Sequence, residues 1–121
     1  MKFMLMICDD EARCLTPDEI AAHPAHSAWT EEMTRRGVLL SGARLRPSAD
    51  ALSVRAHGGE VVVSDGPFME TKEQIGGFVM IECADADEAV EIAARHPFAG
   101  HGVVEVRPVW SEARVERTPG A

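Results

Sequence analysis

The stretch Ser64-Asp65-Gly66-Pro67-Phe68 follows one strand-like segment and precedes another. On its N-terminal side, residues 52–56 and 60–64 are typical of strands, the second with three consecutive valines, and His57-Gly58-Gly59 lies between them. Paired glycines readily adopt the positive φ angles of a tight turn, so this segment predicts a hairpin. On the C-terminal side, the apolar run Phe78-Val79-Met80-Ile81 predicts a buried strand. A group of strands is therefore expected in the middle of the chain.

A strand and a helix are expected before this group. The apolar run from Phe3 to Cys8 has the length of a strand. Thr16-Pro17-Asp18-Glu19 predicts a helix start, because its threonine can cap the first turn, its proline suits the first helical position and its glutamate completes a capping box. We expect this helix to kink or restart at Pro24, which lacks an amide donor, and to end at Gly37.

A second helix and a last strand are expected after the group. Asp85 can cap the helix and Pro97 ends it. Its expected apolar stripe contains Ala86, Ala89, Val90 and Ala93. Residues 103–110 are typical of a strand. The order strand, helix, strands, helix, strand predicts an α+β fold of the ferredoxin-like kind, in which two helices cover one face of an antiparallel sheet.

Length and composition indicate one domain, which we expect over residues 1–110, with a frayed polar tail at 111–121. The longest apolar run, residues 3–8, is too short to cross a bilayer, so no membrane association is expected. The three cysteines show no Cys-x-x-Cys spacing, which disfavours a disulfide framework or a thiolate zinc site. These features fit a reducing, cytoplasmic setting.

Charge and motifs disfavour several classes of function. Twenty acidic and twelve basic residues give a net charge of -8, which repels phosphate backbones, so direct binding of nucleic acid is not expected. The chain has no Gly-x-Gly-x-x-Gly, Walker or Gly-x-Ser-x-Gly motif, and we expect no cofactor. His23 and His26 have a spacing that can bind a metal, but Pro24 interrupts the helix between them, so no metal site is predicted.

The first predicted strand and the run from Phe78 to Ile81 are apolar at consecutive positions, and hence on both faces of the sheet. Two helices can cover only one of these faces. A symmetric homodimer with its sheets packed face to face would cover the other. The alternative is that Met4, Met6 and Met80 are tolerated on a solvated face.

The segment from Ser64 to Phe78, SDGPFMETKEQIGGF, closely resembles the DGPF signature of the YCII-related family. The resemblance extends over roughly residues 1–110 and includes residues 1–5, 37–39, 85–89 and 104–108. It implies a fold similar to the dimeric α+β barrels, a group that includes monooxygenases and muconolactone isomerases with a cleft between sheet and helices. Some DGPF proteins resemble proteins encoded beside extracytoplasmic-function sigma factors.

The resemblance also implies a site formed by a histidine and an aspartate. By position, His26 looks like the histidine, and Asp65 is the best candidate for its acidic partner, although plain YCII members lack the DGPF loop. Where many members read Asp-Pro-Tyr before the last strand, this chain has His96-Pro97-Phe98.

Two readings remain open for both residues. His26 has the helical spacing of Ala22, Trp29 and Met33, so it is expected on the apolar side of its helix. There it is either a core histidine bonded to a backbone carbonyl or a general acid or base in a cleft. Asp65 either stabilises the turn or, if the loop folds over the cleft, orients His26.

Two cations are candidates for contacts with substrate. The loop after Asp65 carries Glu70, Lys72 and Glu73, more charge than a turn needs. Lys72 or Arg44 could receive an anionic group of a substrate. Alternatively, Arg44 is a solvated strand charge and Lys72 pairs with a neighbouring glutamate.

The leading hypothesis is a homodimeric, cofactor-free enzyme or ligand-binding domain. In it, His26 and Asp65 form a proton-transfer pair that acts on a small organic molecule. The second hypothesis is a regulatory or partner-binding module, which the resemblance links to sigma-factor-dependent transcription. In a third, both residues only stabilise the fold.

Overall fold

The computed structural model describes residues 1–13, 15–67 and 73–110. The expected tail at 111–121, together with Phe68 and Lys72, lies outside the described residues. Within the described part of the chain, no helix is long and apolar enough to cross a membrane.

Four antiparallel strands form the main sheet in the order β2-β5-β1-β6. Strands β1 (Lys2–Asp10) and β5 (Glu73–Glu82) are central, and β2 (Leu39–Arg44) and β6 (Val103–Pro108) are the edges. With the helices added, the chain order is β1, helix, β2, β5, helix, β6, interrupted by one hairpin between β2 and β5. This is the ferredoxin-like α+β arrangement, and the predicted fold class is confirmed.

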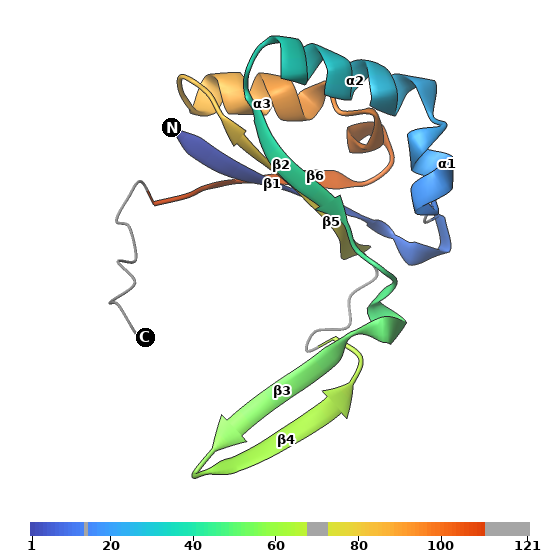
Figure 1. The fold of residues 1–121 in the computed structure, drawn as a ribbon, viewed down its shortest axis with the longest axis vertical. Coiled ribbons are helices and arrows are strands. Elements are labelled where there is room, and N and C mark those ends of the chain that lie inside the picture. The colour runs from blue at the N-terminus through green and yellow to red at the C-terminus, as the bar shows by residue number, and fades with distance from the viewer. Residues whose placement is uncertain (14, 68–72, 111–121) are drawn as a thin grey trace, which may run out of the picture.

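The helices are α1 (Pro17–Ala21), α2 (Pro24–Arg35) and α3 (Ala86–Ala94), and α2 and α3 lie on the same face of the sheet (Figure 1). Three short 3-10 segments join the elements: η1 (Glu11–Arg13), η2 (Ser48–Asp50) and η3 (Pro97–Gly100). The second of the predicted helices is thus a single helix, whereas the first is divided in two.

Local capping explains where the first two helices begin. Thr16 Oγ1 accepts a hydrogen bond from the Glu19 amide at 3.2 Å, and Glu19 Oε1 accepts one from the Thr16 amide at 3.0 Å, so the predicted capping box is confirmed. The predicted restart is also confirmed, because α2 begins at Pro24 with His23 as its N-cap.

The core lies between the sheet and the helices. It contains side chains from β1, β5, α2 and α3: Phe3, Leu5, Ile7, Val79, Ile81, Trp29, Met33, Ala89, Ile92 and Ala93. The indole Nε1 of Trp29 donates to the carbonyl of Ile92 at 3.1 Å, which joins α2 to α3 inside this core.

The predicted apolar faces of the helices are partly wrong. Ala22 is exposed and precedes α2, because the restart at Pro24 breaks the helical phase on which its alignment with His26 depended. In α3 the buried residues are Ala89, Ile92 and Ala93, whereas Ala86 is exposed and the side chain of Val90 is 57% exposed. Val90 lies about 100° around the helix from Ala89, which turns it away from the sheet.

The sheet face opposite the helices is also apolar at its centre. Register pairs Met4 with Met80 and Met6 with Phe78, and all four side chains are half-buried. We call these four residues the open face.

A hairpin separates β2 from β5 in the sequence. It consists of β3 (Leu52–His57) and β4 (Glu60–Asp65), joined by Gly58 at φ 58° and Gly59 at φ 82°, and the prediction of a glycine turn is confirmed. The two strands form a sheet of their own. This sheet projects away from the body of the protein on the side opposite the helices (Figure 1).

Candidate functional site

Two adjoining cavities lie between the helices and the sheet. The first, about 320 Å³, is beside α2, and we call it the histidine cavity. The second, about 350 Å³, extends toward α1 and the C-terminal part of β1, and we call it the outer cavity. Ile7, Ile20, Arg44 and Phe98 line both, so the two cavities form one cleft.

Aromatic rings form one wall of the histidine cavity. The ring centroids of His26 and His96 are 5.7 Å apart with an interplanar angle of 81°. Trp29 contacts His96 edge-on at 4.8 Å, and Phe98 stacks near His26 at 6.0 Å and 23°. His26 and Trp29 come from α2, whereas Phe98 lies in η3 and His96 caps it. Such a ring-lined and largely apolar cavity suits a small, flat molecule.

His96 is the only buried polar residue in the part of the chain that the structure describes, with 2% of its surface exposed. Its Nδ1 accepts a hydrogen bond from the amide of Phe98 at 3.2 Å. A neutral imidazole that accepts at Nδ1 carries its hydrogen on Nε2. This Nε2 is buried and has no hydrogen-bond partner among the described residues. His96 therefore offers a buried donor that lacks an acceptor.

Burial makes the charged form of His96 unfavourable. It lowers the pKa of His96 from 6.5 to about 4, and the nearby His26 adds to the effect. The ring is consequently neutral at pH 7 and remains a hydrogen-bond donor through Nε2.

His26 is half-buried in the first turn of α2. Its backbone amide donates to Nδ1 of His23 at 3.3 Å, but no hydrogen bond joins its imidazole to any residue that the structure describes. Burial lowers the pKa of His26, and His23 lowers it further. The ring is therefore neutral at pH 7 and can accept a proton.

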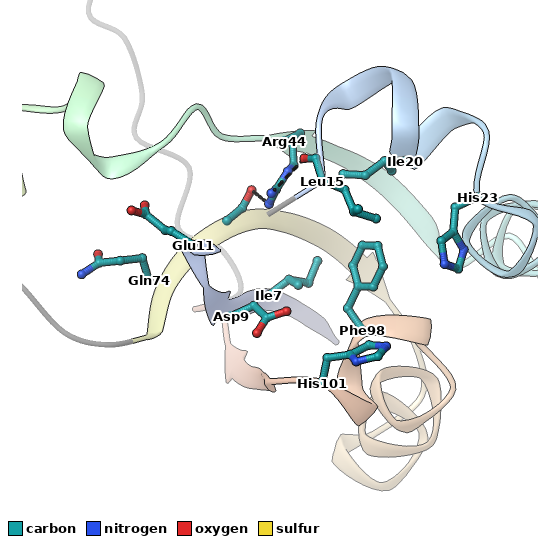
Figure 2. A pocket seen from close by; sticks show the side chains of 11 residues that line it. Ile7, Asp9, Glu11, Leu15, Ile20, His23, Arg44, Gln74, Phe98 and His101 are labelled. Carbon is teal, nitrogen blue, oxygen red and sulfur yellow. Dashed lines mark hydrogen bonds between the residues drawn. The ribbon is translucent and has the colours of Figure 1, made fainter. Parts of the chain in front are cut away.

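The outer cavity is more polar. Figure 2 shows the ring of Phe98 pointing into it between Ile7 and Ile20, with Arg44 on the far wall. Its polar lining consists of Asp9, Glu11, His23, Arg44, Gln74 and His101. Nowhere in the described residues do three or more His, Cys, Asp or Glu side chains gather in a way that could hold a metal ion.

Arg44 helps to build the wall of the cleft. Its guanidinium donates to the carbonyl of Leu15 at 3.3 Å and to the carbonyl of Gly76. A β-carbon at position 76 would meet this guanidinium, so any larger residue there would force the end of the arginine side chain to shift where it crosses β5. Glu11 fixes another part of the rim by accepting hydrogen bonds from the amide and hydroxyl of Ser48 at 2.6 and 2.7 Å.

The four candidate residues from the sequence do not all lie in this cleft. His26 lines the histidine cavity, and Arg44 lines both cavities. Asp65 is exposed at the end of β4 in the hairpin and lines neither cavity. Lys72 lies outside the described residues. The structure thus brings Arg44 to the same cleft as His26 and places Asp65 on a separate element.

The turn after Asp65 has a clear structural role. Gly66 has a φ of 90°, its amide donates to the carbonyl of Ala51 at 2.7 Å, and its carbonyl accepts from the hydroxyl of Ser53 at 2.7 Å. These bonds close the base of the hairpin, and the positive φ favours glycine.

His96 is the residue that the sequence did not assign to the site. Its only signal was that His96-Pro97-Phe98 stands where many related proteins have Asp-Pro-Tyr. His96, which the resemblance places where many family members have an aspartate, contacts His26 in this fold.

Comparison with known proteins indicates the same family as the DGPF segment does. A model of the YCII-related domain matches residues 1–113. The chain belongs to the YCII-related family. An uncharacterized protein from Rhizobium meliloti (strain 1021) is 44% identical to this YCII-related protein over 85 residues, which cover 69% of this chain and 68% of that protein. The resemblance inferred from the sequence is confirmed.

Proposed function

We propose that this protein binds a small, flat organic molecule with a carbonyl or carboxylate oxygen and moves a proton on it. In this proposal His26 accepts the proton and His96 donates a hydrogen bond to the oxygen. The observation that carries it is the buried Nε2 of His96, a donor without an acceptor beside a cavity of about 320 Å³.

The two histidines suit opposite roles because they differ in burial and bonding. His96 holds its proton on Nε2 and cannot easily become charged, so it can polarise an oxygen without giving up the proton. His26 is less buried and its imidazole has no hydrogen bond to the described residues, so it can take a proton.

The reaction class that follows is proton abstraction next to a carbonyl. A C–H bond of the bound molecule breaks, its proton moves to His26, and the electron pair shifts toward the carbonyl oxygen. The hydrogen bond from His96 strengthens as charge grows on this oxygen, which lowers the barrier. Return of the proton to the same carbon gives hydrogen exchange, and return to another carbon gives isomerisation. Both reactions need only the side chains of this protein as acid and base.

In this proposal Arg44 has a role in binding, and Asp65 has no role in the reaction. Arg44 lies on the wall of both cavities, where its charge can hold an anionic end of the molecule. Asp65 is exposed on the hairpin, so His96, and not Asp65, is the partner of His26.

Fluorescence of Trp29 gives a direct test of binding. Trp29 lines the histidine cavity, and the other tryptophan, Trp110, is 97% exposed and can be replaced by phenylalanine. In the Trp110→Phe protein, 2-naphthoate and 2-tetralone are expected to change Trp29 emission in a saturable way. His96→Gln should weaken binding at least about tenfold, which corresponds to one lost hydrogen bond. His57→Gln, on the exposed hairpin, is the control and should bind normally.

Deuterium exchange of 2-tetralone in D₂O, followed by NMR, tests the chemical step. The protein should accelerate exchange, and His26→Gln should reduce the acceleration at least about 100-fold while binding changes little. The proposal is wrong if neither probe binds, or if His96→Gln binds both as well as the His57→Gln control does.

A further inference from the structure

The cleft has a polar group at each of its two ends. At one end, the buried Nε2 of His96 has no acceptor among the described residues. At the other end, the carboxylate of Asp9 lines the outer cavity. The two cavities share four lining residues, so a single molecule can extend from one into the other. The volume of each cavity lies near the lower limit for small-molecule pockets, which leaves room for a ligand that occupies both.

The alternation of β1 directs Asp9 toward the cleft. Phe3, Leu5 and Ile7 are buried on the face that meets the helices. Asp9 is the next residue on this face, and it is half-buried and lines the outer cavity together with Ile7. Figure 2 shows it near Ile7, across the cavity from Arg44. A carboxylate therefore continues a row of apolar core residues.

The carboxylate of Asp9 has one partner. Its Oδ1 accepts a hydrogen bond from the amide of Asp10 at 2.7 Å, and among the described residues it makes no other hydrogen bond and no ion pair. Glu11, the other acid of the outer cavity, uses both of its oxygens to bind Ser48. Asp9 is thus the acid of this cavity with an oxygen available to a ligand, and a half-buried charge is costly without a partner.

Charge and ring chemistry favour a cation at this end. Asp9 and Glu11 carry two negative charges, against one positive charge on Arg44, which donates to two backbone carbonyls on the opposite wall. The net charge of -8 attracts cations to the whole molecule. The ring of Phe98 points into the cavity (Figure 2), and the face of an aromatic ring attracts an ammonium group.

We infer that the ligand carries an ammonium group on a short flexible chain, and that Asp9 binds this group in the outer cavity. This inference rests on the proposed function, which places the flat part of the ligand in the histidine cavity and its oxygen on His96. The ligand class is then a flat carbonyl compound with an amine side chain. Asp9 determines specificity and takes no part in the proton transfer. Arg44 and Asp9 lie on opposite walls and bind groups of opposite charge.

Matched ligands test the ammonium site by isothermal titration calorimetry. 6-(2-Aminoethoxy)-2-tetralone and 6-propoxy-2-tetralone have chains of equal length that end in an ammonium and a methyl group, respectively. The natural protein should bind the ammonium compound at least about tenfold more tightly, because it gains a charge-assisted hydrogen bond. The 3-aminopropoxy and butoxy compounds give the same comparison for a longer chain, and the larger of the two ratios is taken as the preference.

Asp9→Asn and Asp10→Asn are matched variants. They remove the same charge from neighbouring positions on opposite faces of β1, and Asp10 lines neither cavity. An asparagine oxygen can still accept the backbone amide that each carboxylate now accepts, so both variants should fold. Asp9→Asn should reduce the preference at least about fivefold and leave the binding of 2-tetralone and of the alkyl compounds unchanged. Asp10→Asn should keep the full preference.

The outcomes separate this inference from the proposed function. The inference is overturned if 2-tetralone binds but the ammonium group gives no preference, or if the two variants show equal preferences. If the ammonium compounds bind through Asp9 and 2-tetralone does not bind, the proposed function fails and the ammonium site stands. If none of these ligands binds, both are wrong.

Discussion

The imidazole rings of His26 and His96 meet edge to face, with centroids 5.7 Å apart, although one belongs to α2 and the other caps η3. Two histidines in contact cannot easily both be charged in a site that is shielded from water. The pKa of the more buried one, His96, falls to about 4, and the pKa of His26 is lowered mainly by burial. Burial, more than the contact itself, thus keeps both rings neutral at pH 7, so that one can donate and the other can accept.

Stability is expected to fall as the pH decreases through the range of His96. The folded pKa is about 4 and the ordinary value is 6.5, so between these values the unfolded chain binds a proton that the folded chain does not. The free energy of unfolding should decrease by about 3 kcal/mol from pH 6.5 to pH 4, with no contribution from this group above that range. Urea unfolding at a series of pH values measures this slope.

Glu19 also has a lowered pKa, so its contribution to the free energy of unfolding is lost at acid pH as well. The His96→Gln variant keeps the Glu19 contribution and removes only that of His96, so it is the control for this pH dependence. The variant should show a shallower decrease between pH 6.5 and pH 4. Parallel curves for the two proteins would mean that His96 is protonated in the folded state.

Gly76→Ala should destabilise the protein because its methyl group collides with the guanidinium of Arg44. The expected cost is about 1 kcal/mol, at the low end for overpacked sites, because the colliding atoms are the movable end of a long side chain. In an Arg44→Ala background the methyl group has room, so the same substitution should cost clearly less. Urea unfolding of the four proteins in this double-mutant cycle measures the difference. Additive effects would show that position 76 and the arginine do not interact.

Trp29→Phe should destabilise the protein by about 1–3 kcal/mol, because it leaves the buried carbonyl of Ile92 without its donor. Trp110→Phe is the matched control, since Trp110 is 97% exposed, and its effect should stay within about 0.5 kcal/mol. Thermal unfolding followed by circular dichroism suits both variants, because neither tryptophan is then needed as a probe. Equal melting temperatures for the two variants would contradict the role of this bond.

Most elements could be predicted because their signals lie within a few residues. The capping box of Thr16 and Glu19, the restart at Pro24 and the turn at Gly58 and Gly59 depend only on neighbours in the chain. The apolar faces of the helices were less predictable. Val90 shows the reason, since a small shift in helical phase moves a side chain from the core to solvent.

The sequence by itself determined the order of strands and helices, the ferredoxin-like class and membership of the YCII-related family, because each follows from local patterns or from one continuous segment. Only the tertiary structure placed His96 against His26 and Asp65 on the hairpin, away from the cleft. Contacts between residues so distant in the chain depend on how η3 packs beside α2 and on where the hairpin leaves the sheet. No local pattern of residues encodes either of these relationships.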